Sequence, residues 1–152
     1  MQLPDDQPKA DMHPDRLRAL AMLLGISKPA PVAQASVLLL GVSLGSNLLA
    51  LASEYPKATF TAVCLNSQDA SQLQAAYTHL GLHNIQLHLQ DQWLNKDTTQ
   101  TFDYVLCHGY FSYLDSQSKQ TLLDSIRQSL NETGIAYIDY LIEPGWQAFT
   151  TL

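Results

Sequence analysis

The chain has 152 residues, which is the size of one ordinary domain. Hydrophobic residues make up 46% of it, enough to build a core, whereas charged residues make up only 14%, against a usual quarter. The formal net charge is −6, from 14 acidic and 8 basic residues, and this excludes the strongly basic surface of a typical nucleic-acid-binding protein. No apolar run reaches the length of about 18 residues that a membrane span requires, so we expect none.

The amino-terminal residues and the cysteines both indicate a cytoplasmic protein. The first six residues are acidic overall and lack the apolar segment of a secretory signal. Cys64 and Cys107 are too few for a disulfide framework, and no CxxC pair indicates zinc. We therefore expect reduced thiols and no metal site.

The first 36 residues precede the first predicted strand. Residues 1–13 contain prolines and aspartates and are expected to form a flexible lead-in to a single domain over 14–152. Pro14 suits the first turn of a helix, and leucine and alanine at helical spacing predict a helix over 14–25, ended by Gly25. A proline-rich connector then leads into a sheet domain over 36–142.

From Val37 onward, short apolar runs alternate with helical patterns. We predict five strands, over 37–40, 60–65, 85–89, 102–107 and 135–141. The predicted helices lie over 48–55, after a cap at Ser67, and after a cap at Asp115 or Ser116, and a turn is predicted over 131–134. This alternation indicates an open, parallel α/β sheet, which binds ligands beyond the carboxyl ends of its strands.

The segment from Gly41 to Asn47 links the first predicted strand to the next helix. Small residues ahead of a helix leave backbone N–H groups pointing outward, and such a turn suits a nucleotide or another polar cofactor. Ser43 and Ser46 depart from the GxGxxG pattern, and no Gly-Lys-Ser/Thr of a phosphate loop follows. The residues alone leave open a cofactor-binding turn and a plain tight turn.

Four segments in a fixed order carry a family resemblance. They are His13–Leu17, Val37–Leu48, Phe102–Tyr113 and Pro144–Trp146. In this order the chain resembles the bacterial class I S-adenosylmethionine (SAM)-dependent methyltransferases that carry a C-terminal regulatory domain, here without that domain. The resemblance implies a doubly wound, mostly parallel Rossmann-like methyltransferase sheet, truncated after the fifth strand, with SAM as the cofactor.

The resemblance also assigns roles to single positions. The positions that it places around the cofactor, some of them with altered residues, are Gly41, Ser43, Gly45, Asn47, Cys64, Asn66 and Asp91. Asp91 corresponds to the acid that binds the adenine amino group. The positions that it places where the acceptor and the methyl group meet are His108, Tyr110 and Tyr113. Family members related to rickettsial protein lysine methyltransferases imply a protein amine as the acceptor, and aromatic faces attract such a cation.

Two of these positions depart from the family pattern. Leu39 stands where the family has an acid two residues before the first glycine, and Cys64 stands where it has the acid that grips both ribose hydroxyls. A hydrogen bond to a charged group contributes about 1.5–3 kcal/mol, so losing two weakens binding by roughly 10²–10⁴-fold. Asn66 is a neutral replacement for one contact at most.

Two functions follow from this pattern, and the sequence leaves both open. The first is a degenerate methyltransferase-like domain that acts as a non-catalytic binding or assembly module, and the second is an active SAM-dependent methyltransferase. A sheet truncated after its fifth strand has an exposed edge, and natural proteins rarely leave such an edge bare. We therefore expect a homo-oligomer or a protein partner at this edge, unless the chain is a fragment, and no nucleic-acid or membrane partner.

Overall fold

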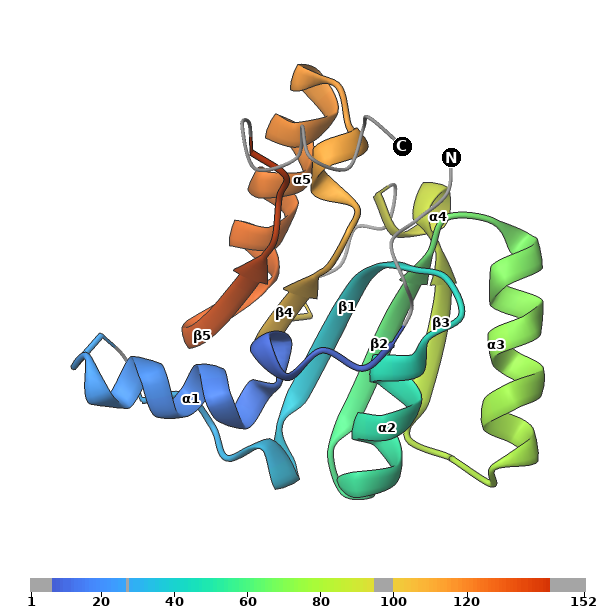
Figure 1. Ribbon diagram of the computed structural model, residues 1–152, viewed down its shortest axis with the longest axis horizontal. Coiled ribbons are helices and arrows are strands. Elements are labelled where there is room, and N and C mark those ends of the chain that lie inside the picture. Colours follow the sequence, from blue (N-terminus) through green and yellow to red (C-terminus); the bar gives the residue numbers. More distant parts are fainter. Residues whose placement is uncertain (1–6, 27, 95–99, 143–152) are drawn as a thin grey trace.

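A computed structural model describes residues 7–26, 28–94 and 100–142 of the chain. Five strands form one parallel sheet in the order β3-β2-β1-β4-β5 (Figure 1). The strands are β1 (Ser36–Val42), β2 (Thr59–Cys64), β3 (Ile85–Leu89), β4 (Phe102–Cys107) and β5 (Leu130–Ile138). The predicted doubly wound, parallel α/β sheet is therefore confirmed.

Helices connect the strands and cover both faces of the sheet. They are α1 (Pro14–Leu23), α2 (Ser46–Glu54), α3 (Ser67–His79), α4 (Gln90–Leu94) and α5 (Ser116–Ser129). Short 3-10 helices lie at η1 (Ala10–Met12), η2 (Val32–Gln34) and η3 (Phe111–Tyr113). Within the described ranges, no helix is both long enough and apolar enough to cross a membrane.

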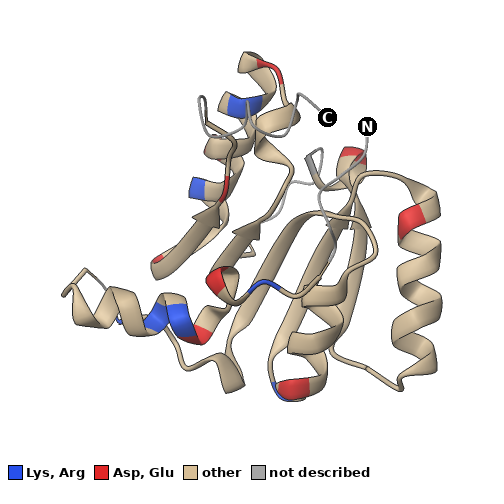
Figure 2. Ribbon diagram, in the orientation of Figure 1, with Lys and Arg blue, Asp and Glu red and all other residues tan. Residues whose placement is uncertain are grey.

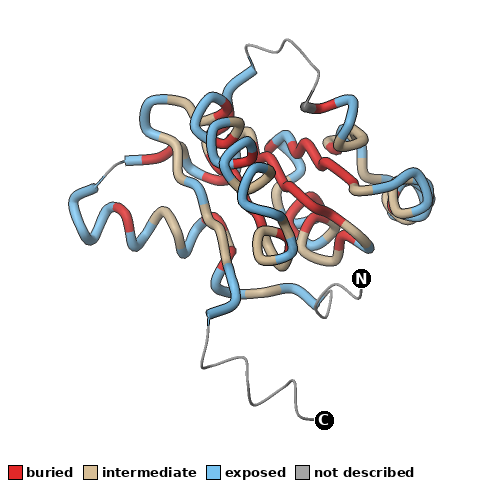
Figure 3. The backbone as a smooth tube through the Cα atoms, turned by 90° about the horizontal axis from the view of Figure 1, so that it is seen from above, coloured by how far each residue is buried: buried red, intermediate tan, exposed pale blue. Residues whose placement is uncertain are grey.

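Alternate residues of β1 pack on opposite faces because successive side chains of a strand point in opposite directions. Leu39 joins a core with α2 and α3 that includes Leu48 and Leu73. Leu40 joins a second core with α4 and α5 that includes Trp93 and Leu122. Figure 3 shows the buried residues running through the middle of the molecule, with exposed residues on the outer helices.

The described part of the expected lead-in packs against the domain. Met12 in η1 is only 3% exposed and belongs to the same core as α2 and α3. The predicted helix over 14–25 is shorter at its end, because α1 stops at Leu23 and Gly25 follows with a φ of +66°. Pro144–Trp146, one of the segments that carry the family resemblance, lies outside the described residues.

The predicted turn over 131–134 is wrong. The structure places these residues inside β5, in a bulge between the Phe102–Leu130 pair and the Tyr104–Ile135 pair. The Asn131 amide donates a hydrogen bond to the Asp103 carboxylate, which holds the bulge against the start of β4. Turn-forming residues are thus accommodated within a strand.

The order of the strands defines where a ligand binds. β1 lies between β2 and β4, and the chain moves to one side of β1 first and to the other side later. This reversal opens a crevice beyond the carboxyl ends of β1 and β4, where open α/β sheets bind their ligands. Lys and Arg do not gather into a stripe anywhere along the described ribbon (Figure 2).

Candidate functional site

The turn after β1 depends on two glycines with left-handed backbone angles. Gly41 has a φ of +72° and Gly45, the residue before α2, has a φ of +77°. A Cβ added at Gly41 would lie 2.7 Å from Cβ and Cγ of Tyr110, and one at Gly45 would lie 2.6 Å from Cδ1 of Leu73. The space beside each glycine is therefore filled by a side chain of this same protein.

The two positions that depart from the family pattern are buried and uncharged. Leu39 is 3% exposed and lies in the core beneath α2 and α3. Cys64 ends β2 with no exposed surface, and burial, with a smaller effect of Asp69, raises the pKa of its thiol to about 11. Cys64 is thus a neutral thiol at pH 7, and it does not supply the charge of a carboxylate.

Asn66, the neutral candidate to replace a lost acid, is engaged in capping α3. Its side-chain oxygen accepts a hydrogen bond from the backbone N–H of Asp69 at 2.9 Å. Its amide nitrogen donates to the Asp69 carboxylate, also at 2.9 Å. Asn66, and not Ser67 as expected, is therefore the N-cap, and ligand binding would have to compete with the cap.

The other predicted cofactor residues lie at the same edge of the sheet, and each has a different setting. Ser43 is half-buried in the turn after β1. The side-chain oxygen of Asn47 accepts a hydrogen bond from the backbone N–H of Lys9 at 2.7 Å, which ties the amino-terminal segment to α2. Asp91 is exposed in the first turn of α4, where its carboxylate accepts from the N–H of Gln92.

His108 follows β4 and pairs with an acid that the sequence reasoning missed. Its Nδ1 contacts the Asp139 carboxylate, and the N–H of Gly109 donates to the other oxygen at 2.6 Å. Burial acts to raise the pKa of Asp139, but the hydrogen bonds from His108 and Gly109 outweigh it and lower the pKa. Because an ionised carboxylate only accepts, Nδ1 carries the proton. Nε2 is buried and has no hydrogen-bond partner among the described residues.

Asp139 could not be found from its own sequence context. It lies within the predicted fifth strand, over 135–141, where a pattern of alternation gives it no special place. The pairing of Cys107 with Ile138 is what sets His108 beside Asp139, one residue beyond each strand. Asp139 is identified as the partner of His108 by the register of two parallel strands, and the spacing of residues along the chain does not reveal this register.

The three predicted acceptor residues do not form one cluster. Tyr110 is 7% exposed and donates from its hydroxyl to Oε1 of Gln90 at 2.8 Å. Tyr113 lies in η3 and is 40% exposed. His108 instead bonds to the loop after β5. The structure therefore places these three side chains in three different environments.

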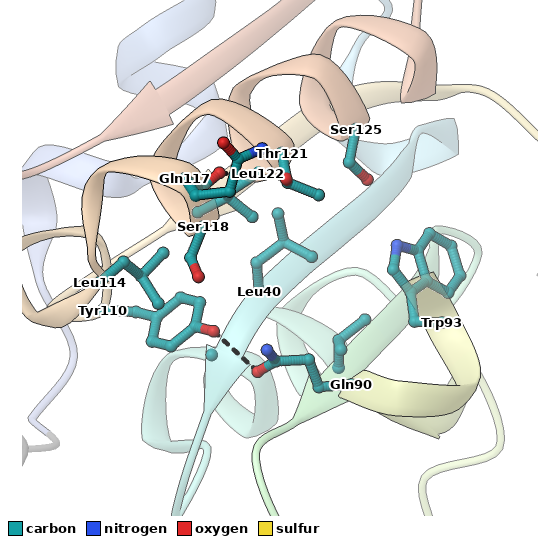
Figure 4. A pocket seen from close by; sticks show the side chains of 12 residues that line it. Leu40, Gln90, Trp93, Tyr110, Leu114, Gln117, Ser118, Thr121, Leu122 and Ser125 are labelled. Carbon is teal, nitrogen blue, oxygen red and sulfur yellow. Dashed lines mark hydrogen bonds between the residues drawn. The ribbon is translucent and has the colours of Figure 1, made fainter. Parts of the chain in front are cut away.

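A pocket opens on the α5 side of the sheet, next to Tyr110 (Figure 4). It holds about 610 Å³ of space between the atoms, its open mouth included. The residues that line it are Leu40, Gly41, Val63, Gln90, Trp93, Tyr110, Leu114, Gln117, Ser118, Thr121, Leu122 and Ser125. In the part of the chain that is described, no group of three or more side chains is arranged to hold a metal ion.

A family model described as a methyltransferase domain matches residues 37–134, from the second residue of β1 to the middle of β5, with all the helices between them. The chain belongs to the methyltransferase domain family. The resemblance to class I SAM-dependent methyltransferases is thereby confirmed.

Solved methyltransferase structures share the fold. PKMT2 from Rickettsia typhi, solved in complex with AdoHcy, is 28% identical, with a TM-score of 0.87 over 97% of this chain and 28% of that chain. Coclaurine N-methyltransferase, bound to N-methylheliamine and SAH, is 20% identical, with a TM-score of 0.64 over 88% of this chain and 38% of that chain. The latter likeness shows the fold alone.

The curated relatives are longer than this chain. The uncharacterized protein RP789 of Rickettsia prowazekii is 33% identical over 148 residues, which are 97% of this chain and 27% of that protein. The uncharacterized protein RP028 of the same organism is 29% identical over 140 residues, 92% of this chain and 56% of that protein. The methyltransferase domain described here thus spans about a quarter of one relative and about half of the other.

The fold supports SAM binding, but the side chains fit this cofactor in part only. The reversal of strand order at β1, the tight turn and the start of α2 are present, as SAM requires. The two acidic positions are filled by the buried Leu39 and the neutral Cys64, and Asn66 is occupied in a helix cap. The backbone features of the site are therefore retained, whereas the two acids of the family pattern, including the one expected to bind the ribose, are missing.

Proposed function

We propose that this methyltransferase domain has lost tight SAM binding and acts as a non-catalytic binding or assembly module. The observation that carries the proposal is Cys64, a fully buried, uncharged thiol at the end of β2. A carboxylate at this position would accept two hydrogen bonds from the ribose, each contributing about 1.5–3 kcal/mol. A buried thiol is a weak partner for hydroxyl groups, so the ribose is left without its main anchor.

The packing of the glycine turn supports the same proposal. In a cofactor site, a glycine keeps the space beside the backbone open for the ligand. Here Tyr110 and Leu73 fill the space beside Gly41 and Gly45. The glycines are thus explained by the protein's own packing, and their presence alone does not indicate a bound cofactor.

The assembly role rests on the edge of the sheet. β5 pairs only with β4 among the described strands, so the other side of β5 presents backbone N–H and C=O groups for pairing. Tyr140, Leu141 and Ile142 follow it and are exposed, at 63%, 43% and 64%. We propose that a strand from a second copy, or from a protein partner, pairs with this edge.

A second candidate function is active methyl transfer to a protein amine, and the His108–Asp139 pair favours it. Asp139 fixes Nδ1 of His108 as a donor and leaves Nε2 as a proton acceptor with no partner among the described groups. A histidine held in this way suits the removal of a proton from an amine. This candidate requires that SAM bind despite the missing acids.

Calorimetric titration of the purified chain with AdoHcy separates the two functions. The proposal predicts a Kd weaker than about 300 µM, and no transfer of a labelled methyl group from SAM to protein substrates. A Kd tighter than this value contradicts loss of tight binding, and methyl transfer that disappears in His108→Ala establishes the active enzyme instead. Near- and far-ultraviolet circular dichroism of both proteins controls for folding.

A further inference from the structure

The pocket on the α5 side lies between two described helices of unequal length. α4, which follows β3, has 5 residues, and α5 has 14. At 1.5 Å per residue α4 is about 8 Å long, whereas the seven residues of β1 extend for roughly 23 Å. The described helices α4 and α5 therefore leave a gap over β1 and β2, with Leu40 and Val63 at its floor.

The walls of this gap are preformed. Trp93 is only 4% exposed, and its ring lies against the rings of His88 and Phe102, with centroids 5.4 Å and 6.0 Å away. On the opposite wall α5 contributes Leu122 and a row of short polar side chains, as Figure 4 shows. The row comprises Ser118, Thr121 and Ser125. Ring packing fixes the aromatic wall, and the short side chains leave the space between the walls open.

The pocket is separated from the predicted cofactor residues. Tyr110 crosses the carboxyl end of β1 and donates its hydroxyl to Gln90, which closes the end of the pocket beside Gly41 (Figure 4). Burial, despite an opposing effect of the Gln90 hydrogen bond, raises the pKa of Tyr110 and keeps this hydroxyl a donor. Of the residues expected to hold the cofactor, Gly41 alone also lines the pocket.

The lining chemistry identifies the class of ligand. The described lining residues include no Asp, Glu, Lys, Arg or His, so a charged ligand would lose its water without gaining an opposite charge. Apolar floor residues, two aromatic rings and a row of hydroxyl and amide groups are typical of a site for a small, flat molecule with one polar edge.

We propose that this pocket binds a small, neutral aromatic molecule, with its ring between Trp93 and Leu122 and its polar edge along the polar side chains of α5. The site lies on the face of the sheet away from α2 and α3, and it does not depend on whether SAM binds after β1. It gives the domain a ligand of its own, distinct from the cofactor of the family. Binding at this pocket is therefore independent of the proposed loss of cofactor binding.

The test is a titration of the ¹⁵N- and methyl-labelled full chain with indole, followed by NMR. We expect shifts of the Trp93 indole N–H and the Gln117 side-chain amide, with a Kd of about 1 mM or tighter. Intermolecular nuclear Overhauser effects should join indole to the methyl groups of Leu40 and Val63. Indole-3-acetate and tryptamine, which carry opposite charges, should bind at least about tenfold more weakly because the described lining residues supply no counter-charge.

A pair of variants on α5 localises the binding. Ser125→Phe fills the pocket and should abolish the indole-induced shifts, whereas Gln120→Phe, at an exposed position on the side of the same helix that is turned away from the pocket, should leave them unchanged. Equal binding to Ser125→Phe and wild type, or equal affinity for the charged analogues, overturns the proposal. So does the absence of Overhauser effects to Leu40 and Val63 in the wild-type protein, a result that does not depend on how well either variant folds. The AdoHcy titration is not affected by any of these outcomes.

Discussion

Gly41 and Tyr110 show how one residue type can serve either a ligand or the fold. The backbone at Gly41 has a φ of +72°, and the Tyr110 side chain lies where a Cβ would be. The sequence predicts the tight turn correctly, because a glycine between a buried strand and a helix is typical of one. It does not reveal that a tyrosine 69 residues further along fills the space.

Gly41→Ala tests this packing, with Gly25→Ala as a matched control. Both positions have left-handed backbone angles, but a Cβ at Gly25 would meet nothing within 4 Å, whereas one at Gly41 would meet Tyr110 at 2.7 Å. We expect Gly25→Ala to lower the free energy of unfolding by about 1 kcal/mol and Gly41→Ala by about 3 kcal/mol or more. Urea denaturation measures both. Equal losses would show that Tyr110 moves aside without cost.

Asp139 makes the free energy of unfolding of the domain depend on pH in the acidic range. Its pKa is lowered in the folded state, so its contribution is complete above the unfolded pKa of about 4 and is lost as the pH falls through the lower, folded value. Asp139→Asn should lower the free energy of unfolding at pH 7 by about 2 kcal/mol and weaken its dependence on pH below about 4. Urea titrations at several pH values measure this. If the free energy of unfolding fell with pH below about 4 as steeply in Asp139→Asn as in wild type, the pairing of Asp139 with His108 would be contradicted.

At the scale of elements, patterns along the chain predicted the strands better than they predicted their ends. The strands over 85–89 and 102–107 agree with the structure residue for residue, because the first alternates apolar and polar side chains and the second is largely apolar. The fifth strand begins at Leu130, five residues earlier than expected. Its bulge depends on a contact with Asp103 on the neighbouring strand, which no local pattern contains.

Asp103 joins the starts of three strands. Its carboxylate accepts hydrogen bonds from the N–H and hydroxyl of Ser36 on β1, at 2.8 and 3.0 Å, and from the amide of Asn131 on β5. Asp103→Ala should therefore lower the free energy of unfolding by about 3 kcal/mol, because it leaves these donors without their acceptor. Asp124→Ala, on the exposed side of α5, should change it by less than about 0.5 kcal/mol. Thermal melting of both variants checks the difference.

At the scale of the whole molecule, the sequence predicted the sheet and the place of the candidate site but not its pairings. The switch point follows from strand order, and the residue types at positions 39 and 64 are enough to mark Leu39 and Cys64 as departures from the family pattern. The His108–Asp139 pair and the pocket beside Tyr110 require the register of β4 with β5 and the packing of α5 on the sheet. The pair and the pocket are formed by contacts between separate helices and strands, and these contacts cannot be read from a single sequence.

The side of β5 that pairs with no described strand leads to a prediction about the molar mass of the protein in solution. If a second copy pairs with this edge, the mass from light scattering should rise toward that of a dimer as the concentration increases. Amide hydrogens over 135–138 should then exchange more slowly in concentrated samples, because pairing protects them. A constant monomer mass with unchanged exchange would contradict self-pairing and leave the edge to a different protein.

The proposed loss of tight cofactor binding depends on the absent carboxylate at the end of β2, and one comparison tests it most directly. The AdoHcy affinities of wild type, Cys64→Asp and Cys64→Ser are measured by calorimetry, with folding checked by circular dichroism. Restoring the charge should tighten binding by about tenfold or more in Cys64→Asp, whereas the neutral Cys64→Ser should bind as weakly as the wild type. Tight binding by the wild-type chain, with no gain in a folded Cys64→Asp, would contradict the proposed loss.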